Sequence, residues 1–204
     1  MLKYALRAVH GPVYTKRLAV VADLIVPHLQ VGNRVLDIGC GSGMLGKTIL
    51  GHAKCPAGIS YVGVEKHKRG NEPIEVVEMT DEALPFGDRE FDAVVVADVL
   101  HHENDEGFLF DQAIRVSRRY VMVKDHKVTG FMGQSRISLL DWAANDPYSV
   151  ECTYRYHTLE EWRSLFRERA LKLVEEKTSI DLYPFPFNTV FGKALQYFAV
   201  LSRA

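Results

Sequence analysis

The chain has 204 residues, of which 47% are hydrophobic and 25% are charged, and its formal net charge is −1. This balance is typical of a globular protein with one sizeable core and excludes a fibrous or disordered chain. Lysine and arginine are spread along the sequence, so we expect no nucleic acid partner. We expect residues 1–204 to form a single domain, and the oligomeric state stays open.

Segments with helical and with extended periodicity alternate along the chain. Apolar residues at helical spacing predict helices over 17–29, 43–53, 107–117, 131–144 and 158–170. Short apolar runs predict strands over 33–39, 59–65, 74–79, 91–100, 119–126, 171–180 and 194–203. Because helices separate most strands, this order predicts an α/β fold: a doubly wound, mostly parallel seven-stranded sheet with helices on both faces and a C-terminal antiparallel strand pair.

Cysteine usage and the N-terminus indicate where the protein works. Cys40, Cys55 and Cys152 are odd in number and form no CxxC pair, which argues against a disulfide framework or a structural zinc site. The N-terminus has charges and no apolar core of signal-peptide length, and no segment approaches the roughly 18 apolar residues of a membrane span. We therefore expect a cytoplasmic protein.

Residues 35–46, "VLDIGCGSGMLG", run from an apolar strand through an acid into a series of glycines. Glycine at a strand-to-helix turn lets the main chain approach a ligand closely, and ligands of doubly wound sheets bind at this edge. Two ligand classes compete, with a ligand-free tight turn as the third alternative. Gly41, Gly43 and Gly46 fit the dinucleotide pattern G-x-G-x-x-G. The carboxylate of Asp37, however, would repel a pyrophosphate and suits a cationic or amino-bearing ligand.

The same stretch resembles the first motif of the class I S-adenosylmethionine-dependent methyltransferases, D-x-G-x-G-x-G, which is D-I-G-C-G-S-G here. Two further motifs follow in order. "YVGVE" ends in Glu65, and "LPFGDREFDAVVVADVLHH" (84–102) is similar to the L-P-F-x-D-x-x-F-D-x-V pattern of the small-molecule branch of that family. The resemblance covers about residues 15–125. It implies a Rossmann-like methyltransferase fold with S-adenosyl-L-methionine as the cofactor.

The resemblance also assigns residues to the methyl donor. The loop residues that would hold its amino acid portion are Asp37, Gly39, Gly41 and Gly43. Glu65 would accept hydrogen bonds from both ribose hydroxyls. The acid that binds the adenine amine usually lies four residues before the leucine of "LPF", where this chain has Thr80, so we choose Asp81, with Glu82 as a solvated alternative. Asp98 either contacts the donor or caps the segment that follows it.

Methyl transfer is an in-line displacement, in which positioning and exclusion of water supply most of the acceleration. A general base is needed only when the acceptor arrives protonated. "KDH", residues 124–126, ends the fifth strand beside the expected donor site. We predict His126 as the base, because the ordinary pKa of histidine suits proton transfer, and Asp125 as the residue that orients it. The alternative is a turn with ordinary solvated charges.

A pair of adjacent histidines, His101 and His102, follows the fourth strand and is itself followed by Glu103. These residue types suggest a metal site, but adjacent residues rarely converge on one ion, so we predict no metal here. We expect His102 instead to pack near the donor and to contact the substrate.

Aromatic residues are concentrated in the last third of the chain, and we expect 127–170 and 182–192 to supply the helices and loops of the acceptor site. Aromatic walls suit an apolar or planar acceptor. The pocket candidates lie in a loop before the expected helix cap Thr158, and are Tyr154, Tyr156 and His157. The aromatic residues expected in the core are Trp142, Trp162 and Phe166.

The sequence thus predicts an enzyme that methylates a small molecule, either apolar or aromatic. An RNA or protein methyltransferase is an alternative, against which the absence of a basic patch argues. A non-catalytic scaffold that binds the donor, and an NAD-dependent oxidoreductase, are the others. The acceptor and the atom that receives the methyl group stay open.

Overall fold

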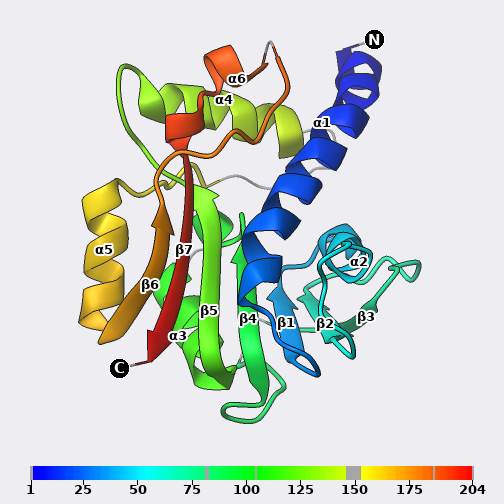
Figure 1. The fold of residues 1–204 in the computed structure, drawn as a ribbon. Helices are drawn as coiled ribbons and strands as arrows, with labels where there is room; N and C mark the ends of the chain where they lie inside the picture. The colour runs from blue at the N-terminus through cyan, green and yellow to red at the C-terminus, as the bar shows by residue number, and fades with distance from the viewer. Residues whose placement is uncertain (1, 81–82, 104, 146–152, 186, 204) are drawn as a thin grey trace.

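The computed structural model describes residues 2–80, 83–103, 105–145, 153–185 and 187–203. Its centre is a seven-stranded sheet in the order β3-β2-β1-β4-β5-β7-β6 (Figure 1). The strands are β1 (Arg34–Ile38), β2 (Ser60–Glu65), β3 (Glu75–Glu78), β4 (Phe91–Ala97), β5 (Ser117–His126), β6 (Leu171–Lys177) and β7 (Gln196–Arg203). Pairs from β3 to β5 are parallel, whereas β7 is antiparallel to both β5 and β6. The predicted sheet, with its C-terminal antiparallel strand pair, is confirmed.

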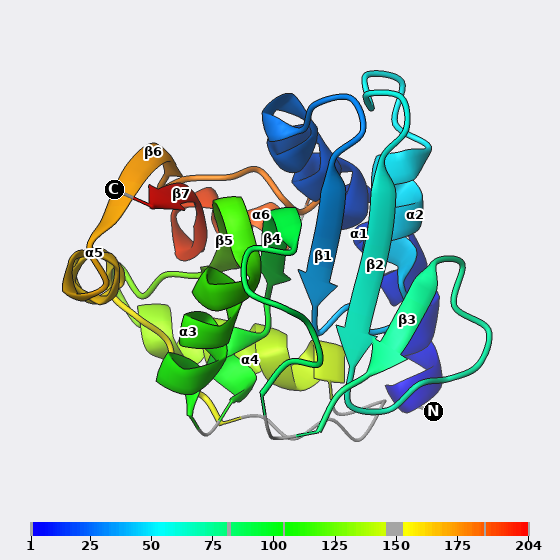
Figure 2. The same ribbon diagram turned by 90° about the horizontal axis from the view of Figure 1, so that it is seen from below.

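Helices cover both faces of this sheet and its upper edge. The described α-helices are α1 (Leu2–Ile25), α2 (Met44–Leu50), α3 (Glu106–Val116), α4 (Gly133–Asn145), α5 (Leu159–Glu168) and α6 (Phe187–Val190). Short 3-10 turns are η1 (Val26–His28), η2 (Leu100–His102) and η4 (Lys193–Leu195). Helices α1 and α2 lie on one face and α3 on the other, while α4 and α6 lie beyond the carboxyl ends of the parallel strands (Figures 1 and 2).

The sheet separates two hydrophobic cores, because alternate strand residues point to opposite faces. Val35 and Leu36 of β1 are both fully buried, one in each core. The helical residues of the first core come from α3 and α5, and include Leu109, Phe110, Ala113, Trp162 and Phe166. Those of the second core come from α1 and α2, and include Leu18, Val21, Ala22, Ile25, Leu45 and Ile49. The expected core positions of Trp162 and Phe166 are confirmed.

The first helix differs from the prediction of a helix over 17–29. It starts at Leu2 and passes through Gly11 and Pro12, two residues that normally mark a helix boundary. It ends at Ile25, and the next turn, η1, is 3-10 and contains Pro27, which has no N–H for an α-helical hydrogen bond. The earlier start lets α1 reach past the carboxyl edge of the sheet toward α4 (Figure 1).

Helix α4 covers the edge of the sheet, and this corrects the expectation for Trp142. Gly133, Ile137 and Asp141 are buried, and their spacing of four residues defines one inner face. Trp142 lies outside this face and is 39% exposed, so it is not a core residue. The expected cap of α5 is present: Thr158 and Glu161 form a reciprocal capping box.

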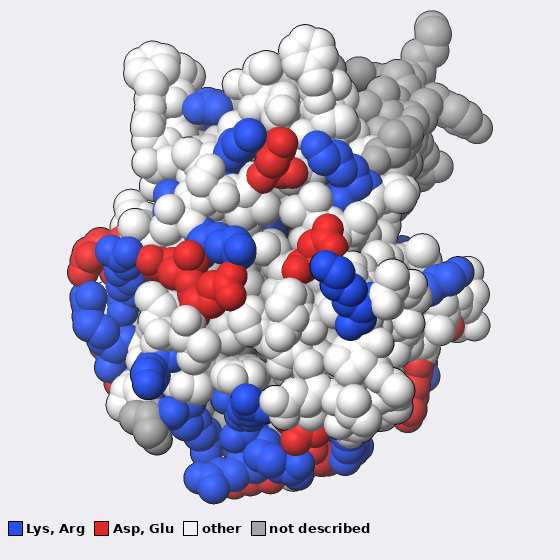
Figure 3. Space-filling model, in the orientation of Figure 1, with Lys and Arg blue, Asp and Glu red and all other residues white. Residues whose placement is uncertain are grey.

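Charged residues of both signs are mixed on the face shown in Figure 3, and Lys and Arg gather at its lower edge. This edge holds the amino ends of the parallel strands, away from the glycine loop. Several of the arginines there pair with acids, in the pairs Arg34–Glu90, Arg115–Asp88 and Arg118–Asp92. Among the described residues, no helix has the length and apolar character needed to span a bilayer.

Candidate active site

Three glycines of the loop between β1 and α2 have left-handed backbone, with φ of 66° at Gly39, 55° at Gly41 and 71° at Gly43. A Cβ at Gly39 would lie 2.6 Å from a Val99 methyl group, and one at Gly43 would lie 2.8 Å from Ile74. At Gly41, no atom of the described residues lies within 4 Å of the Cβ position. Packing therefore requires the outer two glycines, whereas Gly41 keeps space open for a ligand.

This space belongs to a cavity of about 170 Å³ that opens to solvent between the glycine loop and α1. Its lining residues are Tyr14, Arg17, Leu18, Val21, Asp37, Gly39, Cys40, Gly41, Leu45, Ala97 and Asp98. The contribution of α1 is absent from the sequence prediction. No local motif marks it, because α1 reaches the loop only through the packing of the whole sheet face.

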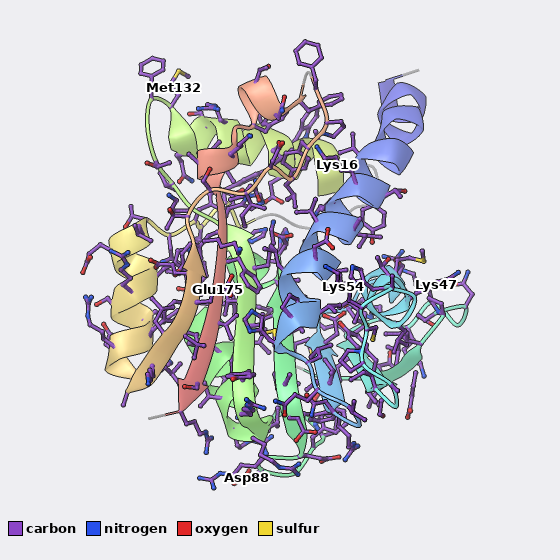
Figure 4. All side chains as sticks on the ribbon, viewed as in Figure 1. Lys16, Lys47, Lys54, Asp88, Met132 and Glu175 are labelled. Atoms are coloured by element: carbon purple, nitrogen blue, oxygen red, sulfur yellow. The ribbon has the colours of Figure 1, made fainter. Side chains whose placement is uncertain are left out.

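In Figure 4, the labelled Lys16 of α1 lies near the top of the sheet, where its Nζ donates to the Tyr183 carbonyl at 3.0 Å.

Asp37 lies at the floor of this cavity and is 1% exposed. Its Oδ2 meets no donor of the described residues in normal hydrogen-bond geometry, although the buried Tyr61 hydroxyl lies close enough to lower the pKa of Asp37. Burial raises the pKa of Asp37 to about 7; the Glu65 carboxylate adds to the rise, whereas Tyr61 and Arg17 oppose it. A buried carboxylate oxygen without a well-placed donor is costly, and a cationic group in the cavity would satisfy it. The site therefore fits the ammonium group of an amino acid.

Glu65 ends β2, and its carboxylate is held against the glycine loop. Its Oε2 accepts a hydrogen bond from the Gly41 N–H at 2.7 Å, and its Oε1 accepts one from the Lys66 N–H at 2.9 Å. Each carboxylate oxygen has further acceptor capacity. The structure thus brings the predicted acid of the second strand and the central glycine together at the edge of the cavity.

A buried ion cluster closes the other side of the cavity. Asp98 follows β4 with a φ of 56°, and its Oδ2 pairs with Arg17 of α1. The Nζ of Lys124 donates to both Asp98 oxygens, at 2.6 and 2.9 Å, and to Gln196 Oε1 at 2.9 Å. Burial alone would raise the pKa of Asp98, but Lys124 and Arg17 hold it well below its ordinary range. Asp98 is therefore ionised and joins α1 to β5, and its contact with the donor stays a prediction.

His126, the last residue of β5, lies next to this cluster and is 6% exposed. Its Nε2 is 3.9 Å from Asp98 Oδ1, and its Nδ1 is 3.4 Å from Gln196 Nε2. Burial and the neighbouring Lys124 charge lower the pKa of His126 to about 4, so its ring is neutral at neutral pH. The structure thus places a neutral imidazole between the donor cavity and the segments expected to hold the acceptor.

Asp125 does not orient the His126 ring as the sequence suggested. Adjacent residues of a strand point to opposite faces, so its carboxylate reaches a different histidine. Asp125 Oδ1 lies 2.6 Å from His101 Nδ1 and also accepts the backbone N–H of His126 at 2.7 Å. Burial would lower the pKa of His101, but Asp125 and Asp141 raise it to about 10.

A polar cluster therefore forms beneath α4. The sequence analysis gave its member His101 no role in a site and did not identify Asp141. His101 and His102 belong to η2, and their ring centroids are 4.1 Å apart. Asp141 lies on the inner face of α4, and its Oδ2 accepts the Tyr156 hydroxyl at 2.8 Å. The Tyr156 ring also packs 5.4 Å from the His101 ring, between centroids. His102 and Tyr156 both lie in this cluster, and their contact with the substrate stays a prediction.

The other predicted pocket residues lie elsewhere. Tyr154 is 40% exposed. His157 turns toward α3, where its Nε2 is 3.0 Å from Glu106 Oε2, and its ring packs against Trp162. The loop before Thr158 sets where the Tyr154 and His157 side chains point. A loop has no regular repeat of apolar residues, so the sequence pattern did not predict these directions. Asp81, the residue chosen for adenine, lies outside the described residues, as does the alternative Glu82.

The parallel sheet, the left-handed glycine loop and the acid at the end of β2 define a protein that binds a nucleoside-containing ligand at the carboxyl edge. Residues 14–176 match the family model described as a methyltransferase domain, so the chain belongs to this family. A methyltransferase domain of this kind fits S-adenosyl-L-methionine as the methyl donor. The buried Asp37 oxygen and the open space at Gly41 fit a donor with an ammonium group and no phosphate.

A curated relative is the ubiquinone biosynthesis O-methyltransferase of Dinoroseobacter shibae, with 33% identity over 90 residues. The aligned region covers 41% of this chain and 36% of that protein, so the chain matches about a third of the relative's length.

Solved structures of low sequence identity share the fold. A chain from the complex of the Haloferax volcanii Trm112 methyltransferase activator with a putative methyltransferase has a TM-score of 0.67 at 15% identity, covering 97% of this chain and 93% of that one. The Burkholderia thailandensis 1,6-didemethyltoxoflavin-N1-methyltransferase, solved with its substrate and S-adenosylhomocysteine, has a TM-score of 0.64 at 17% identity and coverages of 98% and 84%. A SAM-dependent methyltransferase from Aquifex aeolicus has a TM-score of 0.62 at 12% identity and coverages of 99% and 98%.

Donor affinity should depend on pH through Asp37. Below its pKa of about 7, Asp37 is protonated in the free protein and loses its attraction for the donor ammonium group. We therefore expect the Kd of S-adenosylhomocysteine to rise roughly eightfold from about pH 7.5 to about pH 6, measured by isothermal titration calorimetry. Asp37→Asn is the control and should show little change over this range. An equal pH dependence in both proteins would contradict this role of Asp37.

The buried ion cluster should contribute strongly to stability. Asp98→Ala leaves the Lys124 ammonium buried without its anion, so we expect the free energy of unfolding to fall by about 3–5 kcal/mol in urea denaturation. The double variant Asp98→Ala/Lys124→Met should recover part of this loss. The matched control is Asp88→Ala, which removes an exposed partner of Arg115 at the lower edge (Figure 4) and should cost about 0–1 kcal/mol. Equal losses in Asp98→Ala and Asp88→Ala would show that the cluster adds nothing beyond a surface pair.

Proposed function

We propose that the enzyme transfers the methyl group to a small apolar or aromatic molecule that binds beneath α4. The observation that carries this proposal is the position of the polar cluster relative to the donor cavity. His126 lies 3.9 Å from Asp98, a residue of the cavity wall, and its ring lies 5.3 Å from the His101 ring, between centroids. An acceptor next to this cluster would therefore lie close to the methyl group of a donor in the cavity.

The surroundings of the cluster support a small apolar acceptor. Of the described residues of segments 127–170 and 182–192, which the sequence assigns to the acceptor site, Asp141 of α4 and Tyr156 lie in the cluster. Large apolar side chains of these segments are exposed, and are Phe131, Met132, Leu139, Trp142 and Phe185. Met132 lies at the outer end of α4 (Figure 4) and Trp142 lies off its inner face, so these side chains give this end of the molecule an apolar surface that suits an apolar partner. In this proposal, the chain acts as one catalytic domain in the cytoplasm.

The donor supplies a methyl group on a sulfonium centre, so the new acceptor–carbon bond forms as the carbon–sulfur bond breaks and S-adenosylhomocysteine leaves with the electron pair. His126 takes the proton that a hydroxyl or amine acceptor loses. Its neutral ring has one acceptor nitrogen, Nδ1, which the Gln196 amide faces at 3.4 Å and which the acceptor's proton would take over. The lowered pKa makes this ring a weaker base than an ordinary histidine. Asp125 acts as a positioning residue through His101 and the backbone of His126. Burial of these groups excludes water from the reaction.

Two comparisons bear on the acceptor. The relative from Dinoroseobacter shibae is named as an O-methyltransferase of ubiquinone biosynthesis, and this supports an acceptor that carries a hydroxyl group. The Haloferax volcanii structure contains a methyltransferase activator, so a chain that acts together with a partner protein is an alternative to one that acts alone. Arginine pairing with acids at the opposite edge of the sheet favours the small molecule.

A pair of variants should separate donor binding from chemistry. Glu65→Ala removes a carboxylate that would accept the ribose hydroxyls, so donor affinity should fall about tenfold or more. His126→Ala should leave donor affinity nearly unchanged and lower turnover by about a hundredfold to ten-thousandfold. Donor affinity is measured by calorimetry. Turnover is measured with radiolabelled donor and an acceptor found by screening small molecules and by mass spectrometry of co-purified ligand.

The control is Glu75→Ala, which removes an exposed acid at the amino end of β3, whereas Glu65 lies beside the carboxyl end of that strand. This variant should change neither donor affinity nor turnover. Turnover of His126→Ala close to the wild-type value would reject His126 as the base and leave positioning as the mechanism. Methylation of RNA or protein, with no small molecule accepted, would reject the proposed substrate class. Donor binding without turnover on any of these substrates would indicate a scaffold.

A further inference from the structure

Three potential metal ligands converge beneath α4, although two of them are adjacent in sequence. The ligand atoms of His101, His102 and Asp141 all lie within 4.8 Å of one another. Asp141 Oδ1 is 3.6 Å from His101 Nε2 and 3.7 Å from His102 Nε2. Our expectation that the adjacent histidines would diverge does not hold, because η2 turns both rings toward the inner face of α4.

The cluster is largely removed from solvent. The exposed fraction is 3% for the His101 side chain, 4% for Asp141 and 19% for His102. His101 Nε2 has no hydrogen-bond partner among the described residues, although its other nitrogen is tightly held. In the ion-free protein, His101 Nε2 faces Asp141 Oδ1 at 3.6 Å, and a divalent ion would bind in exchange for the proton on the His101 ring. The partial exposure of His102 supplies a route for an ion to enter.

Two of the three potential ligands have the outer partners that metal ligands usually have. His101 Nδ1 lies 2.6 Å from Asp125 Oδ1, which fixes the ring so that Nε2 faces the cluster. Asp141 accepts the Tyr156 hydroxyl through Oδ2 at 2.8 Å, which leaves Oδ1 directed at the histidines. Carboxylate–histidine pairs and hydrogen-bonded carboxylates of this kind orient ligands in metal sites.

We propose that His101, His102 and Asp141 form a binding site for one divalent transition-metal ion of the Fe²⁺ to Zn²⁺ series. Imidazole and carboxylate are the donors that this class of ion accepts. Ligands about 2.1 Å from a tetrahedral ion lie about 3.4 Å apart, so shifts of a few tenths of an ångström would close the two measured distances to Asp141. The two histidine nitrogens lie within 4.8 Å of each other, and rotation of the more exposed His102 ring would close that distance. Three protein ligands leave a coordination position open, as catalytic metal sites do.

The proposed ion would lie beside the acceptor in the proposed function, and its open position would suit an oxygen or nitrogen lone pair of that acceptor. The metal site does not rest on the proposed function, however, because it is built from the protein's own side chains. Donor binding in the cavity and metal binding beneath α4 are measured separately, so either can fail without the other.

Titration of the untagged, chelator-treated protein with Co²⁺ tests this proposal directly. We expect one equivalent to bind, with visible absorption bands of a site of low coordination number, and Zn²⁺ to displace it. His102→Ala and Asp141→Asn should each weaken binding by about tenfold or more, and Tyr156→Phe should weaken it by about tenfold through the loss of orientation. S-adenosylhomocysteine binding and circular dichroism establish that each variant is folded.

The matched control is His52→Ala, which removes a surface histidine paired with Asp23 at 3.0 Å and should leave Co²⁺ binding unchanged. Absence of Co²⁺ and Zn²⁺ binding in the folded wild-type protein at neutral pH would overturn the proposal. Binding that survives unchanged in both His102→Ala and Asp141→Asn, or that is lost equally in His52→Ala, would overturn it as well.

Discussion

The ion pair between Asp98 and Lys124 is the interaction on which the arrangement of the active site depends. Lys124 is 1% exposed, and its ammonium group is accepted by both Asp98 oxygens and by Gln196 of β7. The same Asp98 carboxylate pairs with Arg17, which brings α1 over the glycine loop. Because a buried ammonium group without an anion is strongly destabilising, this pair fixes β4, β5, β7 and α1 relative to one another.

This constraint divides the carboxyl edge of the sheet into two parts. On the side of β1 and β2 lies the donor cavity, with Asp37 buried at its floor and Glu65 bound to the Gly41 N–H. On the side of β5 lies the polar cluster beneath α4, which His126 joins to Asp98. Strands β1 and β4 are neighbours in the sheet although they are not consecutive in the chain, and doubly wound folds bind their ligands at such a switch point.

The sequence predicts those features that depend on short stretches of chain. Strand periodicity locates the sheet, and the glycine pattern of residues 37–43 locates the donor loop, because each rests on backbone rules that act over a few residues. The capping box at Thr158 is local in the same sense. The family resemblance adds Glu65, whose hydrogen bond to Gly41 spans 24 positions.

Long-range contacts account for what the sequence did not predict. Asp125 lies next to His126 in sequence, yet the strand turns its carboxylate to His101, 24 positions away. Asp141 reaches the histidines only because α4 covers the edge of the sheet, and the same placement leaves Trp142 exposed. Asp141 follows Gly133 and Ile137 at a spacing of four residues, which places all three on one face of a helix. The sequence alone does not tell which face of α4 is buried, so this spacing did not identify Asp141.

The central claim is that the cavity at Gly41 binds the donor, and donor affinity of Gly41→Ala measured by calorimetry tests it most directly. Gly32→Ala is the matched comparison, because Gly32 also has left-handed backbone, with φ of 75° against 55° at Gly41, and no described atom lies within 4 Å of its Cβ position either. Both variants should lose about 1–2 kcal/mol of stability from backbone strain. The account predicts that S-adenosylhomocysteine binds Gly32→Ala as it binds the wild type and binds Gly41→Ala at least about tenfold more weakly, since the added methyl group occupies the ligand's space. Equal affinity in the two folded variants would contradict it.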